Sequence, residues 1–571
     1  MAAPGASRSA SGNEAWWKSA VVYQIYVRSF ADSDDDGIGD LPGILEHLDY
    51  LQELGIDVIW LSPVYRSPQE DNGYDVSDYQ DVDPLFGTLE DLDRLLAAVH
   101  LRGMRLIMDL VVNHTSDQHP WFLASRGSRE TATSEWYFWR DARPGTVPGE
   151  PGSEPNNWGA SFGGSAWEWV PERGQYYLHL FARSQPDLNW DNPDTREAVF
   201  TMMNWWLDRG IDGFRMDVIN FISKDPRLPD APLNRDGYGD GMPYFSHGPR
   251  IRDYLSEMKR RVIDSRPSSY LTVGEMPGVT PEQAREFTDQ VHGQLAMVFQ
   301  YEHVTLDADG DKWTQRRMSV KDLRDTLAKW QTALGDTGWN SLYWNNHDQP
   351  RVVSRYGNDT MYWRESATAL ATVLHLHRGT PYVFQGEEIG MTNTRFTGID
   401  DFRDVESLDY YARAVGTHRV DAAVALDTLR RRSRDNARTP MQWSAASGAG
   451  FTTGNPWIGV NPNHSWLNVD AQRGAPGSVY EYYRALIALR HRLPVVVDGH
   501  FAAIDTGRDQ IYAFRRQLGD VTLTVHANLS DLPVSVDRDD RVARELVLAN
   551  YPRSRIDPDR LEPWEVRVYV R

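Results

Sequence analysis

The chain has 571 residues, a formal net charge of -21 and no cysteine. A strongly negative surface repels phosphate backbones, so we expect no nucleic-acid partner. The lack of cysteine excludes disulfides and thiolate metal sites and favours a reducing compartment, which predicts a cytoplasmic protein. No apolar run approaches the roughly 20 residues that cross a bilayer, so no membrane association is expected. Residues 1–13 lack the apolar core of a secretion signal and are predicted to form a short disordered tail.

Short apolar strands alternate with amphipathic helices along most of the chain. The predicted strands are 21–26, 58–61, 105–112, 213–218, 270–275, 294–299, 342–345 and 381–384. The clearest predicted helices are 41–54, 89–101, 195–208 with Asp194 as its N-cap, and 479–492. Eight strand–helix units in this order predict an α/β fold, a parallel (β/α)₈ TIM barrel.

Three segments depart from the barrel pattern. Residues 115–181 are rich in Gly, Pro, Trp and Asn and predict a lobe inserted after the third strand. A second polar insertion, 392–475, follows the eighth strand, and from 494 the apolar period changes to two, which is typical of antiparallel strands. The predicted domains are a catalytic barrel (1–114 and 182–493), the inserted lobe (115–181) and a C-terminal β-sandwich (494–571).

Ionisable side chains gather where the predicted barrel strands end. Asp109 and His114 close the third strand, Asp217 the fourth, Glu275 the fifth and Asp348 the seventh. In barrels of this kind the active site lies at the carboxyl ends of the strands. Four strands that end in carboxylates or imidazoles exceed what packing against loops requires, so the sequence predicts a catalytic site there.

The spacing of these residues indicates a mechanism. Arg215 and Asp217 lie two apart on one strand and therefore share a face. The guanidinium is expected to lower the pKa of Asp217, which suits a nucleophile. Asp217 and Glu275 end neighbouring strands, and neighbouring strands lie about 4.8 Å apart. This spacing is close to the roughly 5–5.5 Å between the two carboxyl groups of retaining glycosidases, whereas inverting enzymes need more room. Cleavage with retention of configuration is therefore predicted.

Four segments, 109–114, 213–220, 272–278 and 345–348, resemble the signature regions of the α-amylase family of glycoside hydrolases (family 13). Segments 185–190 and 438–443 resemble further signatures of its oligo-1,6-glucosidase subfamily, and the resemblance runs from about Trp16 to the C-terminus. It implies that Asp217 is the nucleophile, Glu275 the acid/base and Asp348 the transition-state stabiliser. The substrate-binding residues it implies are Asp71, Tyr74, His114, Phe181, Gln185, Arg215, His347 and Arg438.

The resemblance implies a retaining, exo-acting α-glucosidase that releases glucose from short α-glucosides, with transglycosylation as a side activity. Val218 follows the nucleophile, and in this subfamily Val there is typical of α-1,6 preference; an α-1,4-preferring maltase remains the alternative. Sucrose isomerases carry an Arg-Leu-Asp-Arg-Asp motif, and the corresponding stretch here, 305–309, lacks both arginines. Trehalose-6-phosphate hydrolases need a cation for the phosphate, which the sequence does not identify.

An acidic loop, 32–40, offers oxygen ligands at alternate positions. It is similar to the start of an EF-hand, but position twelve is Gly43 rather than the bidentate Glu. It also resembles the calcium loop of this subfamily, which implies a structural Ca²⁺, with Mg²⁺ as the alternative. The implied ligands are Asp32, Asp34, Asp36, Asp40 and the Ile38 carbonyl. The only other partner expected is a small oligosaccharide substrate, on a monomer or weak homodimer.

Overall fold

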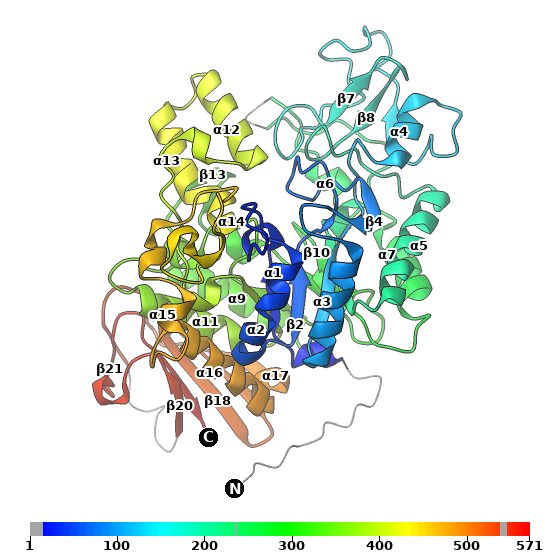
Figure 1. Cartoon of the computed structure of the whole chain (residues 1–571). Coiled ribbons are helices and arrows are strands. Elements are labelled where there is room, and N and C mark those ends of the chain that lie inside the picture. Colours follow the sequence, from blue (N-terminus) through cyan, green and yellow to red (C-terminus); the bar gives the residue numbers. More distant parts are fainter. Residues whose placement is uncertain (1–14, 235–236, 537–544) are drawn as a thin grey trace.

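The structure is a computed structural model that describes residues 15–234, 237–536 and 545–571 (Figure 1). The tail predicted at 1–13 lies outside these residues. Eight described strands form one parallel sheet in the order β11-β10-β9-β5-β2-β1-β15-β14, and a parallel bridge between Val298 and Asn340 joins its two ends. The predicted barrel is therefore confirmed. Its strands are β1 (Val22–Ile25), β2 (Val58–Leu61), β5 (Arg105–Val111), β9 (Gly213–Asp217), β10 (Leu271–Glu275), β11 (Met297–Phe299), β14 (Ser341–Tyr343) and β15 (Thr380–Phe384).

The barrel strands are short and buried on both faces. Every residue of β1, β2, β9, β10 and β15 is buried. This is the pattern expected when helices cover the outside of a parallel sheet and side chains fill its inside. All eight predicted strands overlap the observed ones, and the largest difference is at β11, which begins three residues after the predicted start at 294.

Helices surround the barrel. They are α1 (Leu41–Glu46), α2 (Leu48–Leu54), α3 (Leu89–Leu101), α5 (Pro193–Arg209), α6 (Met242–Phe245), α7 (Ile251–Met258), α8 (Pro281–Phe287), α9 (Val320–Leu334), α10 (Val352–Arg355), α11 (Trp363–His375) and α16 (Val479–Arg492). The helices predicted at 89–101 and 479–492 are confirmed. The single helix predicted at 41–54 is wrong, because it is broken at His47, whose ring Nδ1 lies 2.9 Å from the Gly43 carbonyl oxygen and competes with the helical hydrogen bond.

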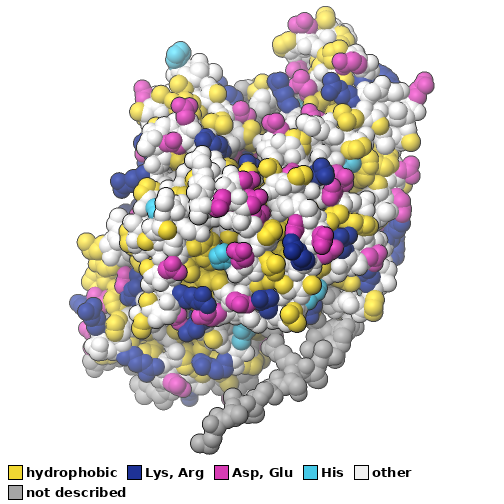
Figure 2. Space-filling model, in the orientation of Figure 1, with side chains coloured by type: hydrophobic (Ala, Val, Ile, Leu, Met, Phe, Trp, Pro, Cys, Tyr) yellow, Lys and Arg dark blue, Asp and Glu magenta, His cyan; other side chains and the backbone are white. Residues whose placement is uncertain are grey.

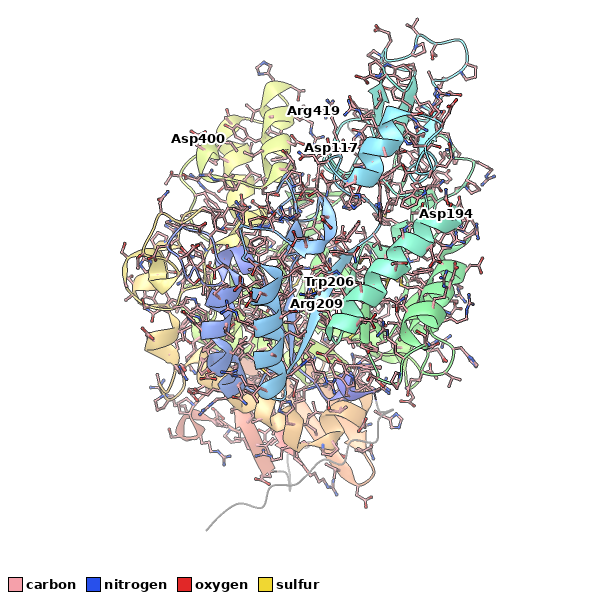
Figure 3. All side chains as sticks on the ribbon, turned by 45° about the vertical axis from the view of Figure 1, so that its right-hand side comes forward. Asp117, Asp194, Trp206, Arg209, Asp400 and Arg419 are labelled. Carbon is pink, nitrogen blue, oxygen red and sulfur yellow. The ribbon has the colours of Figure 1, made fainter. Side chains whose placement is uncertain are left out.

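The cap predicted for the helix at 195–208 is also wrong. The side chain of Asn192 accepts a hydrogen bond from the Asp194 backbone N–H, and Pro193 occupies the first helical position. Proline tolerates that position because its missing N–H would be unpaired there anyway. Asp194 therefore lies inside the first turn, where its charge favours the helix dipole. Asp194 and Arg209 mark the two ends of α5 in Figure 3.

The lobe after β5 contains a helix and a small antiparallel sheet. Its elements are α4 (Pro120–Gly127), β6 (Trp139–Arg140), β7 (Trp167–Val170) and β8 (Gln175–Leu178), with the sheet in the order β6-β8-β7. A hydrophobic cluster that includes Trp158 and Trp167 stabilises the lobe and continues to Val218 and Phe221 at the barrel. The lobe is therefore packed directly against the segment that follows β9.

The insertion after β15 is more regular than the sequence pattern indicates. It holds α12 (Val405–Gly416), α13 (Ala422–Arg432), α14 (Asp435–Arg438) and α15 (Val469–Gln472). Two further strand pairs follow the carboxyl ends of barrel strands and lie at that end of the barrel. They are β3 (Tyr65–Arg66) with β4 (Asp78–Val82), and β12 (Ala308–Asp309) with β13 (Asp311–Gln315). Figure 1 shows the lobe and the insertion rising side by side from this end, and Figure 2 shows the surface dropping between them.

The C-terminal domain lies at the opposite end of the barrel (Figure 1). Its described strands form an antiparallel sheet in the order β16-β17-β18-β22-β20 and a smaller sheet of β19 with β21. The bounds are α17 (Pro494–Asp498), β16 (His500–Ile504), β17 (Ile511–Leu518), β18 (Val521–Asn528), β19 (Val534–Ser535), β20 (Glu545–Ala549), β21 (Arg560–Leu561) and β22 (Val566–Val570). Arg516 anchors the domain to the barrel by donating to the Leu376 carbonyl, and it also donates to the Val496 carbonyl within the domain.

The helices of the described residues include none that is both long and apolar enough to cross a membrane. The surface seen in Figure 2 carries acidic and basic side chains interspersed among apolar ones.

Candidate active site

A cavity of about 620 Å³ opens at the carboxyl ends of the barrel strands. Its lining combines the strand ends with side chains from both insertions: Phe162 and Phe181 come from the lobe, and Glu406 and Arg434 from the second insertion. Of the predicted site residues, those that line the cavity are Asp71, Tyr74, His114, Phe181, Asp217, Val218, Glu275, His347 and Asp348. Nine of the residues predicted from the sequence therefore surround one cavity.

Arg215 is the centre of the charged cluster at the base of the cavity. Its Nη1 donates to Asp109 Oδ1 at 2.5 Å and to Asp217 Oδ1 at 2.7 Å. Its Nη2 lies 2.6 Å from Glu275 Oε2. The parallel register explains these contacts, because Arg215 pairs with Asp109 across β5–β9, and β10 lies on the other side of β9. The predicted shared face of Arg215 and Asp217 and the neighbouring positions of Asp217 and Glu275 are confirmed.

The expected lowering of the pKa of Asp217 is wrong. Burial raises its pKa well above the ordinary value; Arg215 opposes this rise, and the carboxylates of Glu275 and Asp109 add to it. The prediction considered the adjacent guanidinium alone, whereas one guanidinium here faces three carboxylates. Ionising all three in a buried site is costly, so the cluster favours keeping one proton. Acid/base catalysis by two carboxyl groups requires such a proton.

Asp348 is held in the ionised form by three cationic or imidazole groups. Its Oδ2 lies 3.1 Å from His347 Nε2, and its Oδ1 accepts from Arg438 at 2.9 Å and from Arg434 at 3.2 Å. Burial alone would raise the pKa of Asp348, but His347 and the two arginines outweigh it and hold the pKa well below its usual range. The third carboxylate thus stays charged at the cavity wall.

His347 is fixed on both sides. Its Nδ1 lies 2.8 Å from Gln24 Nε2, and its ring stacks on Tyr74 with centroids 5.0 Å apart. Burial raises the pKa of Tyr74 well above its ordinary value, so its hydroxyl stays protonated and donates to Asp109 Oδ2 at 3.2 Å. These contacts fix the Tyr74 and His347 rings of the cavity wall through partners on β1 and β5.

His114 and Phe181 form another wall. The two rings lie 5.2 Å apart. Burial lowers the pKa of His114, which the charges of Asp187 and Asp71 offset only in part, so the imidazole is neutral near pH 7. Its Nε2 lies 3.0 Å from the Tyr74 carbonyl oxygen. A neutral imidazole beside a ring face offers a hydrogen bond and an apolar contact to a sugar.

Three predicted substrate-binding residues lie behind the cavity rather than in its lining. Gln185 is fully buried and donates to Asp71 Oδ2 at 3.1 Å. Arg438 is fully buried and holds Asp348, and Arg215 holds the carboxylates described above. Each of the three is buried and contacts a residue that lines the cavity. Each therefore orients a lining residue and does not itself face the cavity.

The sequence analysis missed Arg434, which does line the cavity. Arg434 Nη2 donates to Asp71 Oδ1 at 3.0 Å and lies 2.6 Å from Asp404 Oδ1, while its Nη1 reaches Asp348. Its guanidinium also stacks over Phe162 of the lobe at 5.0 Å, so the two insertions meet here. A signal was present: Arg434 precedes Arg438 by four residues, the spacing that places two side chains on one helical face.

Val218 lies just past the end of β9 and not inside the strand. Its φ of 32° and ψ of 43° are left-handed, a conformation that is unfavourable for a β-branched residue. Its backbone N–H donates to Glu275 Oε2 at 3.0 Å. The strained turn therefore holds the Glu275 carboxylate and turns the Val218 side chain into the cavity lining.

The acidic loop gathers part of the predicted metal site. Carboxylate oxygens of Asp32, Asp34 and Asp40 all lie within 4.8 Å of one another. Asp36 does not belong to this group; its Oδ1 accepts the Ile38 N–H at 2.7 Å, which stabilises the turn itself. Three hard oxygen donors at this spacing fit a Ca²⁺ or Mg²⁺ ion. Ion binding by this loop stays a prediction, as does ligation by Asp36 and by the Ile38 carbonyl.

The comparisons identify a family for most of the chain. The family model for the α-amylase catalytic domain matches residues 24–499. The chain is 50% identical over 562 residues to an oligo-1,6-glucosidase of Parageobacillus thermoglucosidasius, covering 97% of this chain and 98% of the relative. It is similar in structure to a trehalose-6-phosphate hydrolase of Bacillus licheniformis (TM-score 0.90, 42% identity, 97% and 99% coverage) and to a trehalulose synthase (TM-score 0.91, 42% identity, 98% and 100% coverage).

Proposed function

Because the chain belongs to the α-amylase family and is a glycoside hydrolase, we propose that it is a retaining, exo-acting α-glucosidase that prefers α-1,6 linkages. It would release glucose from the non-reducing end of isomaltose-type oligosaccharides. The observation that carries this proposal is the pair of carboxyl groups on neighbouring strands, Asp217 and Glu275, joined by one guanidinium at the base of the cavity.

In this mechanism Glu275 protonates the glycosidic oxygen while Asp217 attacks the anomeric carbon. The C1–O bond to the leaving sugar breaks, and a glucosyl ester forms on Asp217. Glu275 then removes a proton from water, which attacks C1 and releases glucose with the original configuration. Asp348, held ionised, faces the positive charge that develops at C1.

Exo action is supported by the contact between the two insertions. Arg434 stacks on Phe162 and pairs with both Asp71 and Asp348. These side chains would block one side of the cavity, so that a sugar chain could enter only by its end. Asp71, Tyr74, His114, Phe181 and His347 would contact the non-reducing glucose, with Arg434 added to the predicted set. Arg215, Gln185 and Arg438 would orient these groups.

The α-1,6 preference rests on Val218 and on the relatives. Four of the curated relatives at 46–51% identity carry the name oligo-1,6-glucosidase. The fixed left-handed turn commits the Val218 side chain to the cavity next to Glu275. A branched side chain there would narrow the space beside the leaving sugar, which an α-1,6 linkage tolerates because it adds a flexible methylene.

A phosphorylated substrate is disfavoured by the charges of the cavity. Among the described residues, four cationic side chains line it, and each is paired: Lys312 with Glu406, Arg355 and Arg432 with Asp307, and Arg434 with four carboxylates. A phosphate would have to displace one of these partners. The stretch 305–309 contributes Thr305 and Ala308 to the lining and no arginine, which disfavours the sucrose isomerase alternative.

Three further properties belong to this proposal. A second sugar can replace water in the final step, so transglycosylation should accompany hydrolysis. A divalent ion, Ca²⁺ in preference to Mg²⁺, would be held by Asp32, Asp34 and Asp40, and it would stabilise the fold without a part in the reaction. A cytoplasmic location and a monomer or weak homodimer fit a cysteine-free, strongly negative chain.

Initial rates on isomaltose, maltose, sucrose and trehalose 6-phosphate, measured side by side, test the proposal. We expect the largest kcat/KM on isomaltose, and no isomaltulose from sucrose. A larger kcat/KM on maltose would refute the α-1,6 preference in favour of α-1,4 cleavage. A larger kcat/KM on trehalose 6-phosphate would show that the substrate is a phosphorylated disaccharide.

A further inference from the structure

Tyr301 is a cavity residue that the catalytic scheme above does not use. It lies two residues after the end of β11, and its hydroxyl donates to Glu275 Oε1. The other carboxylate oxygen, Oε2, accepts from the Val218 N–H at 3.0 Å and faces Arg215 Nη2 at 2.6 Å. The two oxygens of Glu275 therefore have different partners, and Oε2 is fully engaged by the backbone and the guanidinium.

The turn that carries Tyr301 is fixed by its own hydrogen bonds. The Tyr343 hydroxyl donates to the Gln300 carbonyl at 2.8 Å, and the Gln300 side chain accepts from the Glu302 N–H at 2.7 Å. Gln300 Nε2 lies 2.7 Å from His303 Nδ1. Because the backbone on both sides of Tyr301 is held, its hydroxyl is pre-positioned at Oε1.

We propose that Tyr301 is a positioning residue for proton transfer, whose hydroxyl selects Oε1 of Glu275 as the oxygen that delivers the proton and then stabilises the carboxylate that remains. This inference rests on the proposed function of Glu275. In the step, the proton moves from Oε1 to the glycosidic oxygen, the C1–O bond breaks, and a bond forms between C1 and Asp217. Tyr301 keeps its own proton throughout, because burial and the nearby Glu275 charge raise its pKa well above the ordinary value.

The hydrogen bond acts mainly in the transition state. A hydroxyl donates weakly to a neutral carboxylic acid but strongly to a carboxylate, so the bond strengthens as Glu275 gives up its proton. Only interactions that strengthen in this way speed the chemical step. The contribution should be largest for leaving groups that need full protonation, such as the hydroxyl of a second sugar, and small for p-nitrophenolate, which leaves as an anion.

The charged and titratable groups around Glu275 are few. Arg215 and Asp217 face it from β9, Tyr301 from the turn after β11, and Tyr343 from β14. Of these, only Tyr301 donates to Oε1 within the described residues. Removing its hydroxyl therefore removes a donor that favours the ionised form of Glu275, and the basic limb of the pH–rate profile should move to higher pH.

The test compares Tyr301→Phe with the wild-type chain on isomaltose and on p-nitrophenyl α-glucoside. We expect kcat on isomaltose to fall about tenfold to a hundredfold, the range of one hydrogen bond to a charged group. On the activated substrate kcat should fall less than about threefold, and the basic limb of the pH–rate profile on isomaltose should move to higher pH. Equal losses on both substrates with an unmoved limb would overturn the proposal.

Tyr343→Phe is the matched control. It removes a buried hydroxyl that holds the same turn by donating to the Gln300 carbonyl instead of to Glu275. It should lower stability without moving the basic limb or creating a leaving-group dependence; if it reproduces the Tyr301→Phe profile, the effect comes from the turn and the proposal is wrong. The wild-type rates distinguish failure of this inference from failure of the proposed function. A wild-type chain that is inactive on isomaltose refutes the proposed function. An active wild-type chain whose rates are unchanged by Tyr301→Phe refutes only this inference.

Discussion

We expect His375, a buried histidine in α11, to make the stability of the protein dependent on pH. It is fully buried, its ring lies edge-to-face on Tyr483 at 5.6 Å, and within the described residues neither ring nitrogen has a hydrogen-bond partner. Burial lowers its pKa to about 3, with a smaller effect from Arg490 in the same direction. The folded protein therefore keeps this ring neutral, while the unfolded chain binds a proton below about pH 6.5.

The sign and size follow from the two pKa values. Stability from the neutral ring is present above about pH 6.5 and is lost as the pH falls towards 3, because only the unfolded state takes up the proton in that window. The loss is about 2 kcal/mol at pH 5 and approaches about 5 kcal/mol below pH 3. Domains are stable by about 5–15 kcal/mol in total, so the effect at pH 5 is large enough to measure.

His375→Leu tests this reasoning, because leucine has a similar volume and does not titrate. Guanidinium unfolding followed by tryptophan fluorescence at pH 7, 6 and 5 gives the free energy of unfolding of each variant. The variant should lose about 2 kcal/mol less than the wild type between pH 7 and 5. The exposed His292→Gln is the control and should keep the wild-type dependence. If His375→Leu also keeps it, the assignment of the acid sensitivity to this ring is refuted.

Three further predictions concern the site and the metal loop. Val218→Ala should raise the rate on maltose relative to isomaltose, since it widens the space beside Glu275; an unchanged ratio of the two kcat/KM values would remove Val218 from the specificity assignment. Arg434→Met should lower kcat/KM by roughly a hundredfold, mainly through KM, because it leaves Asp71 and Asp348 short of a buried partner; wild-type kinetics would show that Arg434 does not shape the glucose pocket. Chelation should lower the melting temperature by a few degrees and added Ca²⁺ should restore it; a melting curve indifferent to both would refute the ion.

The barrel and the residues at its strand ends were predictable because topology alone brings them together. Asp109, Asp217, Glu275 and Asp348 lie at or near the carboxyl ends of different strands of one closed parallel sheet, so their meeting follows from the order of the strands. The sign of the pKa shift at Asp217 was not predictable from one neighbour. It depends on the number of carboxylates that share Arg215 and on burial, and both are properties of the assembled site.

The residues that the insertions supply were harder to predict. Arg434 reaches Asp71 across more than 360 positions of sequence, and only the packing of α13 and α14 over the barrel places it there. Tyr301 carried a weak signal, since it follows the sixth barrel strand by two residues, where a site residue is expected. Its contact with Oε1 of Glu275 depends on the fixed turn around Gln300, which no sequence pattern specifies.

The central claim is that glucose is transferred first to Asp217 and then to water. An activated fluorinated glucosyl fluoride, which slows the second step, should accumulate as an ester on the enzyme, and peptide mass spectrometry should find the added glucosyl mass on the peptide that contains Asp217. The account predicts this label in the wild type and its absence in Asp217→Asn. A label on a different carboxylate, or turnover of isomaltose that releases β-glucose first, would contradict it.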